Sequence, residues 1–371
     1  MRDMIRQKLD VIDQLYPPSR LARSRERWQR LWAGLPVLDR LPFVFAPLTL
    51  DYYAAARHPA GRLDVILDEI ILRGRLEDDF IPAFFPGCRQ ATIPNLFGAG
   101  EIATGTDHAC TRLSGGIAGG GCLPEPAIVP GTIAHEWLAM QQYVLEETEG
   151  RLPVHVTDMQ GPHDVCGQLY GYEDFLACAY EDEPLFRALL DRVTEAFILF
   201  WEAQQRVAGD CFVGTHLFGW DWVPSDAGAS CSADSLVMVS PDFYRAFYEP
   251  YLARIADRLG GLSVHSCGDF SAVVPALCAT PGVRAVNAGQ LAPAQLAIAG
   301  ATGRTLLIAI IPIADVPQTV QLIRERALRV DLTVSHAIPS RPGTTPADWS
   351  DAEWRLLARQ NAGLIELLSQ A

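Results

Sequence analysis

Residues 305–311 read Thr-Leu-Leu-Ile-Ala-Ile-Ile, a near-continuous apolar run. Such a run is typical of a parallel strand that is covered on both faces, because neither face meets water. Other short apolar runs predict further strands at residues 43–49, 154–159, 211–218, 262–266, 285–288 and 332–335. Helical patterns lie between the strands, for example at residues 133–149, 184–208, 241–259, 271–279, 316–328 and 346–368.

Short strands that alternate with helices of this length predict parallel pairing through right-handed crossovers. The expected fold class is therefore α/β, and for 371 residues the expected architecture is a (β/α)8 barrel of the TIM type. Residues 1–35 contain two helical patterns separated by Pro17-Pro18, which we interpret as an N-terminal helical extension. Residues 36–371 then form the barrel domain.

The charge balance bears on the kinds of partner the protein has. The chain carries 30 basic and 44 acidic residues and a net charge of −14, so we expect no binding to nucleic acid or to a membrane. Its nine cysteines include no Cys-x-x-Cys pair, which favours free thiols in a reducing compartment. Without a signal-peptide core or a stretch of ~20 apolar residues, the chain is expected to be soluble and cytoplasmic.

Polar side chains follow several predicted strands. In a parallel α/β barrel the reactive groups lie at the C-terminal ends of the strands, where the loops meet at one mouth. We therefore expect a small-molecule substrate at that mouth, bound by residues that lie in or just after strands. The candidates for binding are Asp158, Gln160, His216, Trp220, Trp222 and Asn287, and the candidates for acid or base chemistry are Asp221, Asp226 and His336.

The segment after residue 218 combines two tryptophans with two acids. Trp220 and Trp222 would form a flat wall for a planar or methylated substrate, and Asp221 and Asp226 would act as acid or base. The alternative is a loop whose tryptophans plug the end of the barrel and whose acids cap the helix near Ser235.

A possible metal site begins with His265 and Cys267. These residues are two positions apart, so their side chains point to the same side of an extended strand. Neutral imidazole and thiolate are preferred zinc ligands, and a catalytic zinc site has three protein ligands and one open position. His336 is the candidate for the third ligand because it follows a later strand. The alternative is a core histidine beside a buried free cysteine.

Several stretches together resemble the uroporphyrinogen decarboxylase superfamily, whose members are (β/α) barrels. The resemblance covers the chain from residue 24 to the C-terminus, in the order of the family. The matching stretches are Ser24-Arg25-Glu26-Arg27, Asp39-Arg40-Leu41-Pro42, Asn95-Leu96-Phe97-Gly98, Gln160-Gly161-Pro162, Val239-Ser240-Pro241, Tyr248-Glu249-Pro250, His265-Ser266-Cys267-Gly268, His336-Ala337-Ile338-Pro339 and Thr345-Pro346.

The resemblance is closer to the methyltransferase branch than to the decarboxylase. The decarboxylase has an Arg-Gln-Ala-Gly-Arg-Tyr stretch for substrate carboxylates, which is not found in residues 43–60. In the methyltransferase branch, His265-x-Cys267 corresponds to two zinc ligands, and a Cys-x-Ile-Pro stretch supplies the third. This chain has His336-Ala337-Ile338-Pro339 there, and imidazole is also a zinc ligand. The resemblance thus implies zinc at His265, Cys267 and His336.

The resemblance implies an enzyme in which zinc activates a thiol that accepts a methyl group from a corrinoid or another methylated donor. A corrinoid protein and a second copy of the chain are the candidate partners. One alternative is a metal-independent decarboxylase of a smaller pyrrolic or aromatic acid, with Asp226 and His336 as a proton relay. Asp226 is preferred over Asp221 because the family often has an acidic residue in this loop. Another alternative is a non-catalytic corrinoid-binding or tetrapyrrole-binding protein.

Overall fold

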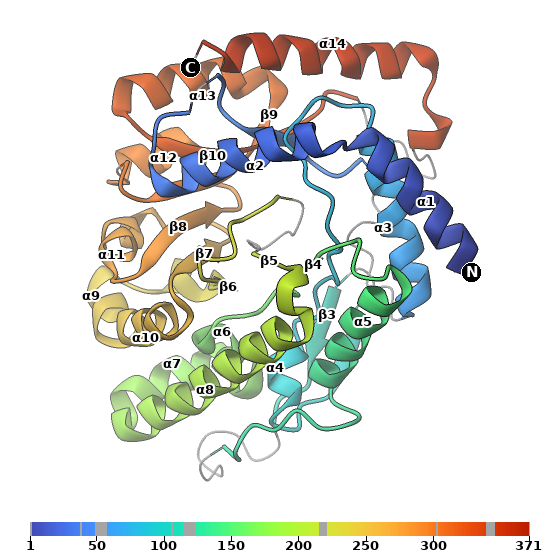
Figure 1. Cartoon of the computed structure of the whole chain (residues 1–371). Coiled ribbons are helices and arrows are strands. Elements are labelled where there is room, and N and C mark those ends of the chain that lie inside the picture. The colour runs from blue at the N-terminus through green and yellow to red at the C-terminus, as the bar shows by residue number, and fades with distance from the viewer. Residues whose placement is uncertain are drawn as a thin grey trace.

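A six-stranded parallel sheet forms the largest part of the computed structural model, in the order β1-β10-β9-β8-β7-β6 (Figure 1). The structure describes residues 2–37, 39–48, 58–104, 107–113, 123–214, 221–301, 303–338 and 346–370. The strands of this sheet are β1 (Phe43–Phe45), β6 (Ala229–Ser232), β7 (Leu262–Ser266), β8 (Val283–Ala288), β9 (Leu306–Pro312) and β10 (Arg329–Ser335). The predicted α/β class is confirmed.

The two edges of this sheet are joined through the N-terminal half of the chain. β4 (Val154–His155) pairs in parallel with β5 (Phe212–Val213), and the segment around β4 also pairs with two other parts of the chain. Three isolated parallel pairs make these links: Phe84 with Val154, Cys88 with Asp158, and Gln160 with Ser232 of β6. Together with a hydrogen bond from Asp79 N–H to the Phe43 carbonyl of β1 at 2.8 Å, they close a ring of strands, the expected barrel.

Two buried carboxylates take the place of backbone acceptors beside β1. The N–H groups of Phe43 and Phe45 donate to the side chains of Asp79 and Asp78, at 3.2 and 3.1 Å. Asp79 is also paired with Arg27, at 2.7 Å, and with Arg40. The stretches around Arg27 and Arg40, which carry part of the family resemblance, therefore act together to close the barrel at this strand.

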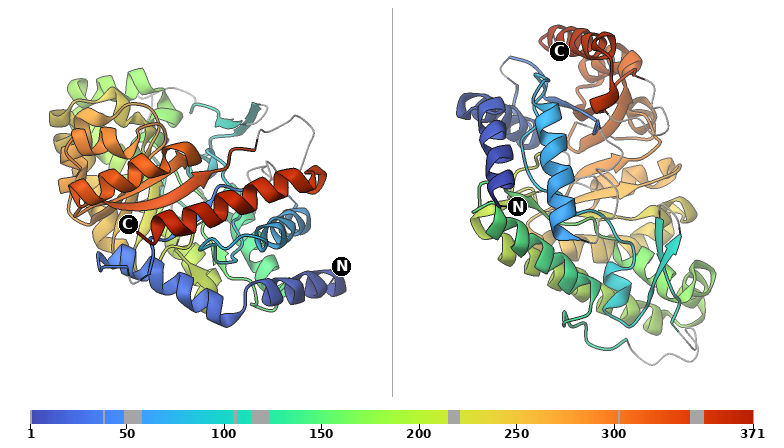
Figure 2. Two further views of the ribbon diagram at one scale, coloured as in Figure 1. Left: turned by 90° about the horizontal axis from the view of Figure 1, so that it is seen from above. Right: turned by 90° about the vertical axis from the view of Figure 1, so that its right-hand side faces the viewer.

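Helices surround the strands in all views (Figure 2). None of the described helices is both long and apolar enough to cross a membrane. A short antiparallel pair, β2 (Glu101–Thr104) and β3 (Asp107–Cys110), lies apart from the ring. The helices are α1 (Arg2–Leu15), α2 (Pro18–Ala33), α3 (Pro59–Arg73), α4 (Thr92–Asn95), α5 (Ile133–Glu147), α6 (Pro162–Tyr170), α7 (Tyr172–Glu181), α8 (Glu183–Ala208), α9 (Pro241–Phe243), α10 (Glu249–Leu259), α11 (Val274–Ala279), α12 (Pro293–Ile298), α13 (Val316–Arg326) and α14 (Asp351–Leu368).

The two N-terminal helices share the core of the barrel. Trp28 of α2 is fully buried, and its Nε1–H donates to the Asp79 carbonyl at 2.9 Å. Arg329, the first residue of β10, donates to the carbonyl oxygens of Leu31 and Trp32 at 2.6 Å. The helix α2 therefore covers the N-terminal ends of strands, on the side of the barrel opposite the mouth.

The strand β6 was not predicted from the sequence. It reads Ala-Ser-Cys-Ser, and such small residues give no apolar or β-branched signal. The prediction instead placed residues 219–226 in a loop at the mouth, after a strand at 211–218. The structure shows a strand at Phe212–Val213, and residues 221–228 lead into β6 at its N-terminal end.

Two carboxyl groups lie together inside the ring. Asp221 and Asp331 are 1% and 0% exposed, and Asp221 Oδ2 accepts a hydrogen bond from Thr333 Oγ1 at 3.2 Å. Burial, and next the charge of Asp221, raise the pKa of Asp331 well above its usual value. Burial and the neighbouring Asp221 therefore both favour the protonated form of Asp331.

We expect Asp331→Asn to stabilise the protein at about pH 8 relative to about pH 5. A carboxyl whose pKa is raised by folding gives stability below its unfolded pKa of ~3.9, and this stability is lost as the pH rises through the folded pKa. The Asn variant keeps a hydrogen-bond donor at this position but cannot ionise. Its free energy of unfolding at pH 8 should therefore exceed that of the wild type by about 1 kcal/mol or more. Urea denaturation at both pH values measures this, and an equal destabilisation at both would contradict it.

Candidate metal centre

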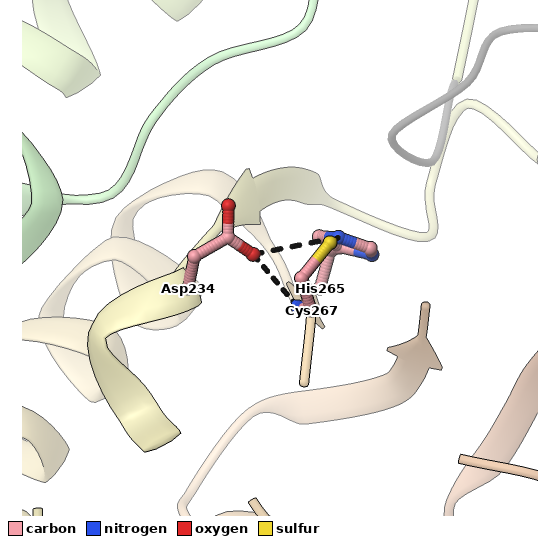
Figure 3. Close-up of side chains that lie close together, drawn as sticks. All are labelled: Asp234, His265 and Cys267. Carbon is pink, nitrogen blue, oxygen red and sulfur yellow. Dashed lines mark hydrogen bonds and ion pairs between the residues drawn. The ribbon is translucent and has the colours of Figure 1, made fainter. Parts of the chain in front are cut away.

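Three potential metal ligands meet beyond the C-terminal ends of β6 and β7. Asp234 begins the 3₁₀ helix η3 (Asp234–Met238), His265 lies in β7, and Cys267 follows β7 directly. One ligand atom from each lies within 4.8 Å of the others, and the three side chains point toward one another (Figure 3). In the described part of the chain, this is the one group of three such residues.

Two distances in this group match those between neighbouring ligands of a tetrahedral zinc site. His265 Nε2 lies 3.3 Å from Cys267 Sγ and 3.5 Å from Asp234 Oδ1. Two ligands on one zinc ion, with bonds of 2.0–2.3 Å, are roughly 3.3–3.6 Å apart. One thiolate and one carboxylate balance the charge of Zn²⁺, and the imidazole stays neutral. Cys267 is exposed, so the group is open to solvent on this side.

Asn287 orients the imidazole of His265. The two residues are register partners in β7 and β8, and His265 Nδ1 lies 3.1 Å from Asn287 Oδ1. With the Nδ1 hydrogen donated to this oxygen, the lone pair of Nε2 points to Cys267 and Asp234. A partner of this kind on the second nitrogen is typical of metal-binding histidines. Asn287, predicted to bind substrate, is in contact with the candidate ligand His265.

Asp164 holds Asp234 in place from helix α6. Its carboxylate accepts the backbone N–H groups of Asp234 at 2.6 Å and of Ser235 at 2.9 Å. It thereby caps η3 as a helix N-cap does. Burial raises the pKa of Asp164 to about 7. Sequence reasoning gave no role to Asp164 or Asp234, because the contact between them depends on the path of the chain after β6, a strand that the sequence did not reveal.

The electrostatics of the group favour a cation. Burial, and next the negative charge of Asp234, raise the pKa of the Cys267 thiol. Asp234 Oδ1 also accepts the backbone N–H of Cys267 at 2.7 Å, so the carboxylate and the thiol are held at close range. A cation bound between them would offset this repulsion and favour the thiolate. Gly289 leaves room for the thiol, since a Cβ there would lie 3.1 Å from Cys267 Sγ.

His336, predicted as the third ligand, lies outside this group. It follows β10, which is three strands away from β7 in the sheet. Its ring packs edge-on against Trp349, with centroids 5.4 Å apart, and its Nδ1 accepts the N–H of Ile338 at 3.3 Å. Burial lowers the pKa of His336, so the neutral ring is favoured. In the structure Asp234, from the adjacent strand, is the third residue of the group.

The predicted acids Asp221 and Asp226 lie away from the candidate metal centre, the group of Asp234, His265 and Cys267. Asp226 is exposed, and its backbone carbonyl accepts a hydrogen bond from Arg284, the second residue of β8, at 2.9 Å. Its prediction at the mouth is therefore wrong, because the chain has returned to the N-terminal end of the barrel to enter β6. Asp221 forms the buried pair with Asp331. Trp222 packs half-buried against the core. His216 and Trp220 lie outside the described residues.

Asp158 and Gln160 both lie near the group. Gln160 is the bridge partner of Ser232, which is itself the register partner of His265. Asp158 Oδ2 accepts a hydrogen bond from Cys88 Sγ at 3.0 Å. Burial raises the pKa of Asp158 to about 7, and the charge of Asp234 contributes to this shift.

Comparisons with known proteins confirm the family resemblance. The family model described as uroporphyrinogen decarboxylase (URO-D) matches residues 134–309, which include Asp164, Asp234, His265, Cys267 and Asn287. Among solved structures, the fold is similar to that of a methyltransferase from Methanosarcina mazei, with a TM-score of 0.63 and 16% sequence identity. The match covers 92% of this chain and 97% of the other. No curated protein sequence matches.

We expect Asp234→Ala, His265→Ala and Cys267→Ala each to abolish zinc binding, and His336→Ala to keep it. The reason is that the first three supply the ligand atoms of the group. Elemental analysis after growth with zinc should give about one equivalent for the wild type and His336→Ala. Zinc retained by Asp234→Ala, or lost from His336→Ala, would show that the ligand set is different.

The partner of His265 gives a second prediction. Asn287→Ala should weaken zinc binding by about 10–100-fold, because the imidazole loses the acceptor that fixes its orientation. Competition with a chromogenic chelator measures the affinity. Asn361→Ala in α14 is the matched control, since Asn361 is similarly buried but accepts the N–H of Glu77. An equal change in both variants would mean a general loss of stability.

Proposed function

We propose that the protein is a methyltransferase in which a metal-bound thiol accepts a methyl group from a corrinoid or another methylated donor. The observation that carries this proposal is the convergence of Asp234, His265 and Cys267 within 4.8 Å. Its position beyond the C-terminal ends of barrel strands is where enzymes of this architecture have their active sites. The family match and the similarity in fold to a methyltransferase support the same reading.

The ligand residues define what the site can do. When bound, zinc supplies the Lewis acidity that lowers the pKa of a substrate thiol, so that the thiolate can attack a methyl group. Asp234 and Cys267 contribute two negative charges, one more than the set of two histidines and a cysteine expected from the sequence. This charge favours a more nucleophilic thiolate. His265, held by Asn287, completes the set without adding charge.

The surroundings of Cys267 suit a large methyl donor. Cys267 is exposed, and Val237 of η3, which lies against the following residue Gly268, is 45% exposed. We propose that a corrinoid carried by a partner protein is the donor, since a bulky macrocycle needs an open approach. The metal-independent decarboxylase alternative loses its support, because its relay needs Asp226 at the mouth.

Methyl transfer gives the direct test. Zinc-loaded protein, methylcobalamin and 2-mercaptoethanol should yield S-methyl thioether and cob(I)alamin, followed by mass spectrometry and visible absorbance. Cys267→Ala should lower the rate of methyl transfer by more than about 100-fold. Replacing a residue that only hydrogen-bonds a metal ligand typically lowers activity about 10–100-fold, and Cys267 is itself a candidate ligand. Asp226→Asn is the control and should keep the wild-type rate.

Two results would contradict the proposal. Methyl transfer by Cys267→Ala at the wild-type rate would show that the candidate metal centre is not required for the reaction. Binding of cobalamin by the wild type without thioether formation, for a series of neutral and charged thiols, would favour the non-catalytic corrinoid-binding alternative.

A further inference from the structure

The strand segment at residues 154–160 alternates between the outside and the inside of the barrel. Met159 faces outward, because its Sδ accepts a hydrogen bond from Gln204 Nε2 of α8 at 3.5 Å. Successive side chains of a strand point to opposite faces. Asp158 and Gln160, on either side of Met159, therefore point into the barrel.

Backbone pairing places Asp158 next to the metal group. Gln160 pairs with Ser232, and Ser232 pairs with His265. Asp234 comes two residues after Ser232, at the mouth, whereas Asp158 comes two residues before Gln160. Asp158 thus lies on the adjacent strand, below the candidate ligands and facing the same interior.

The hydrogen bond with Cys88 holds the carboxylate of Asp158. The two residues are bridge partners, and Cys88 Sγ lies 3.0 Å from Asp158 Oδ2. Cys88 is half-buried, whereas Asp158 is 7% exposed. The thiol therefore covers the carboxylate on one side. Asp158 is not among the three residues whose potential ligand atoms lie within 4.8 Å of one another.

Asp158 interacts electrostatically with residues of the candidate metal centre. The titratable groups that interact with Asp158 are Asp234 on η3, Cys231 in β6, Cys267 after β7, and Cys88. The charge of Asp158 raises the pKa of the Cys267 thiol, and the charge of Asp234 raises that of Asp158. With a pKa raised to about 7, mainly by burial, Asp158 can exchange a proton near neutral pH.

We propose that Asp158 accepts the proton that a substrate thiol gives up on binding. This inference rests on the proposed function, since it requires a thiol at the centre. The S–H bond of the substrate breaks and its electron pair stays on sulfur, while the proton forms an O–H bond with the Asp158 carboxylate. One negative charge thereby moves from Asp158 to the substrate sulfur, and no proton has to cross to solvent.

The test counts the protons that are released when 2-mercaptoethanol binds to zinc-loaded protein. Calorimetry in two buffers of different protonation enthalpy gives this number. At about pH 6 Asp158 is already protonated, so the wild type should release about one proton per thiol. At about pH 8 the ionised carboxylate takes up part of that proton, so the release should fall clearly below one. Asp158→Asn should release about one at both pH values.

Two further variants sharpen the test. The hydrogen bond from Cys88 lowers the pKa of Asp158, so Cys88→Ala should shift the fall in proton release to higher pH. This variant also carries the test if Asp158→Asn does not fold. Asp331→Asn, a buried carboxyl away from the site, should behave like the wild type.

The outcomes separate this inference from the proposed function. Thiol binding with the same proton release in the wild type and in Asp158→Asn at both pH values would overturn the role of Asp158 and leave the proposed function standing. An unchanged pH dependence in Cys88→Ala would also count against it. If zinc-loaded wild type binds no thiol, the proposed function fails and this inference fails with it.

Discussion

The parallel register between β6 and β7 is the constraint on which the candidate site depends. Ser232 pairs with His265, so the chain beyond each strand leaves the sheet at the same level. Asp234 and Cys267, each two residues further on, are then neighbours, and the Cys267 N–H donates to Asp234 Oδ1 at 2.7 Å. A slip of one residue would turn the inward side chains of one strand outward, and the three ligand atoms would no longer meet.

Buried carboxyl groups are used in different ways across this barrel, and each has a different set of partners. Asp79 neutralises arginines and accepts backbone N–H groups where β1 joins the ring. Asp164 accepts two N–H groups of η3, and Asp158 accepts a thiol. Asp331 has another carboxyl, Asp221, as its neighbour, and the charge of Asp221 adds to the effect of burial on its pKa. Burial raises the pKa in each of the last three cases, but only Asp158 faces the ligand group from the adjacent strand.

The sequence predicted the parts of the fold whose signal is local. Apolar runs marked β7, β9 and β10, and His265-x-Cys267 marked two of the three grouped residues. The strand β6 has only small side chains, so hydrophobic periodicity could not reveal it. Asp234 and Asp164 were missed for this reason, and Asp226 was placed at the wrong end of the barrel. These errors concern the path of the chain between strands. That path depends on which strands pair with each other, and local sequence patterns do not reveal it.

The grouping of Asp234, and not His336, with His265 and Cys267 goes with the order of the strands. Neighbouring strands are about 4.8 Å apart, so β10 lies roughly 14 Å along the sheet from β7, whereas β6 is adjacent to it. His336 follows the more distant strand β10, whereas Asp234 comes two residues after β6 and lies within the group. In the described structure the neighbouring strand therefore supplies the third residue of the group, whereas the strand end that carries His336-Ala337-Ile338-Pro339 does not. His336 packs against Trp349 instead, and its Nδ1 accepts the N–H of Ile338.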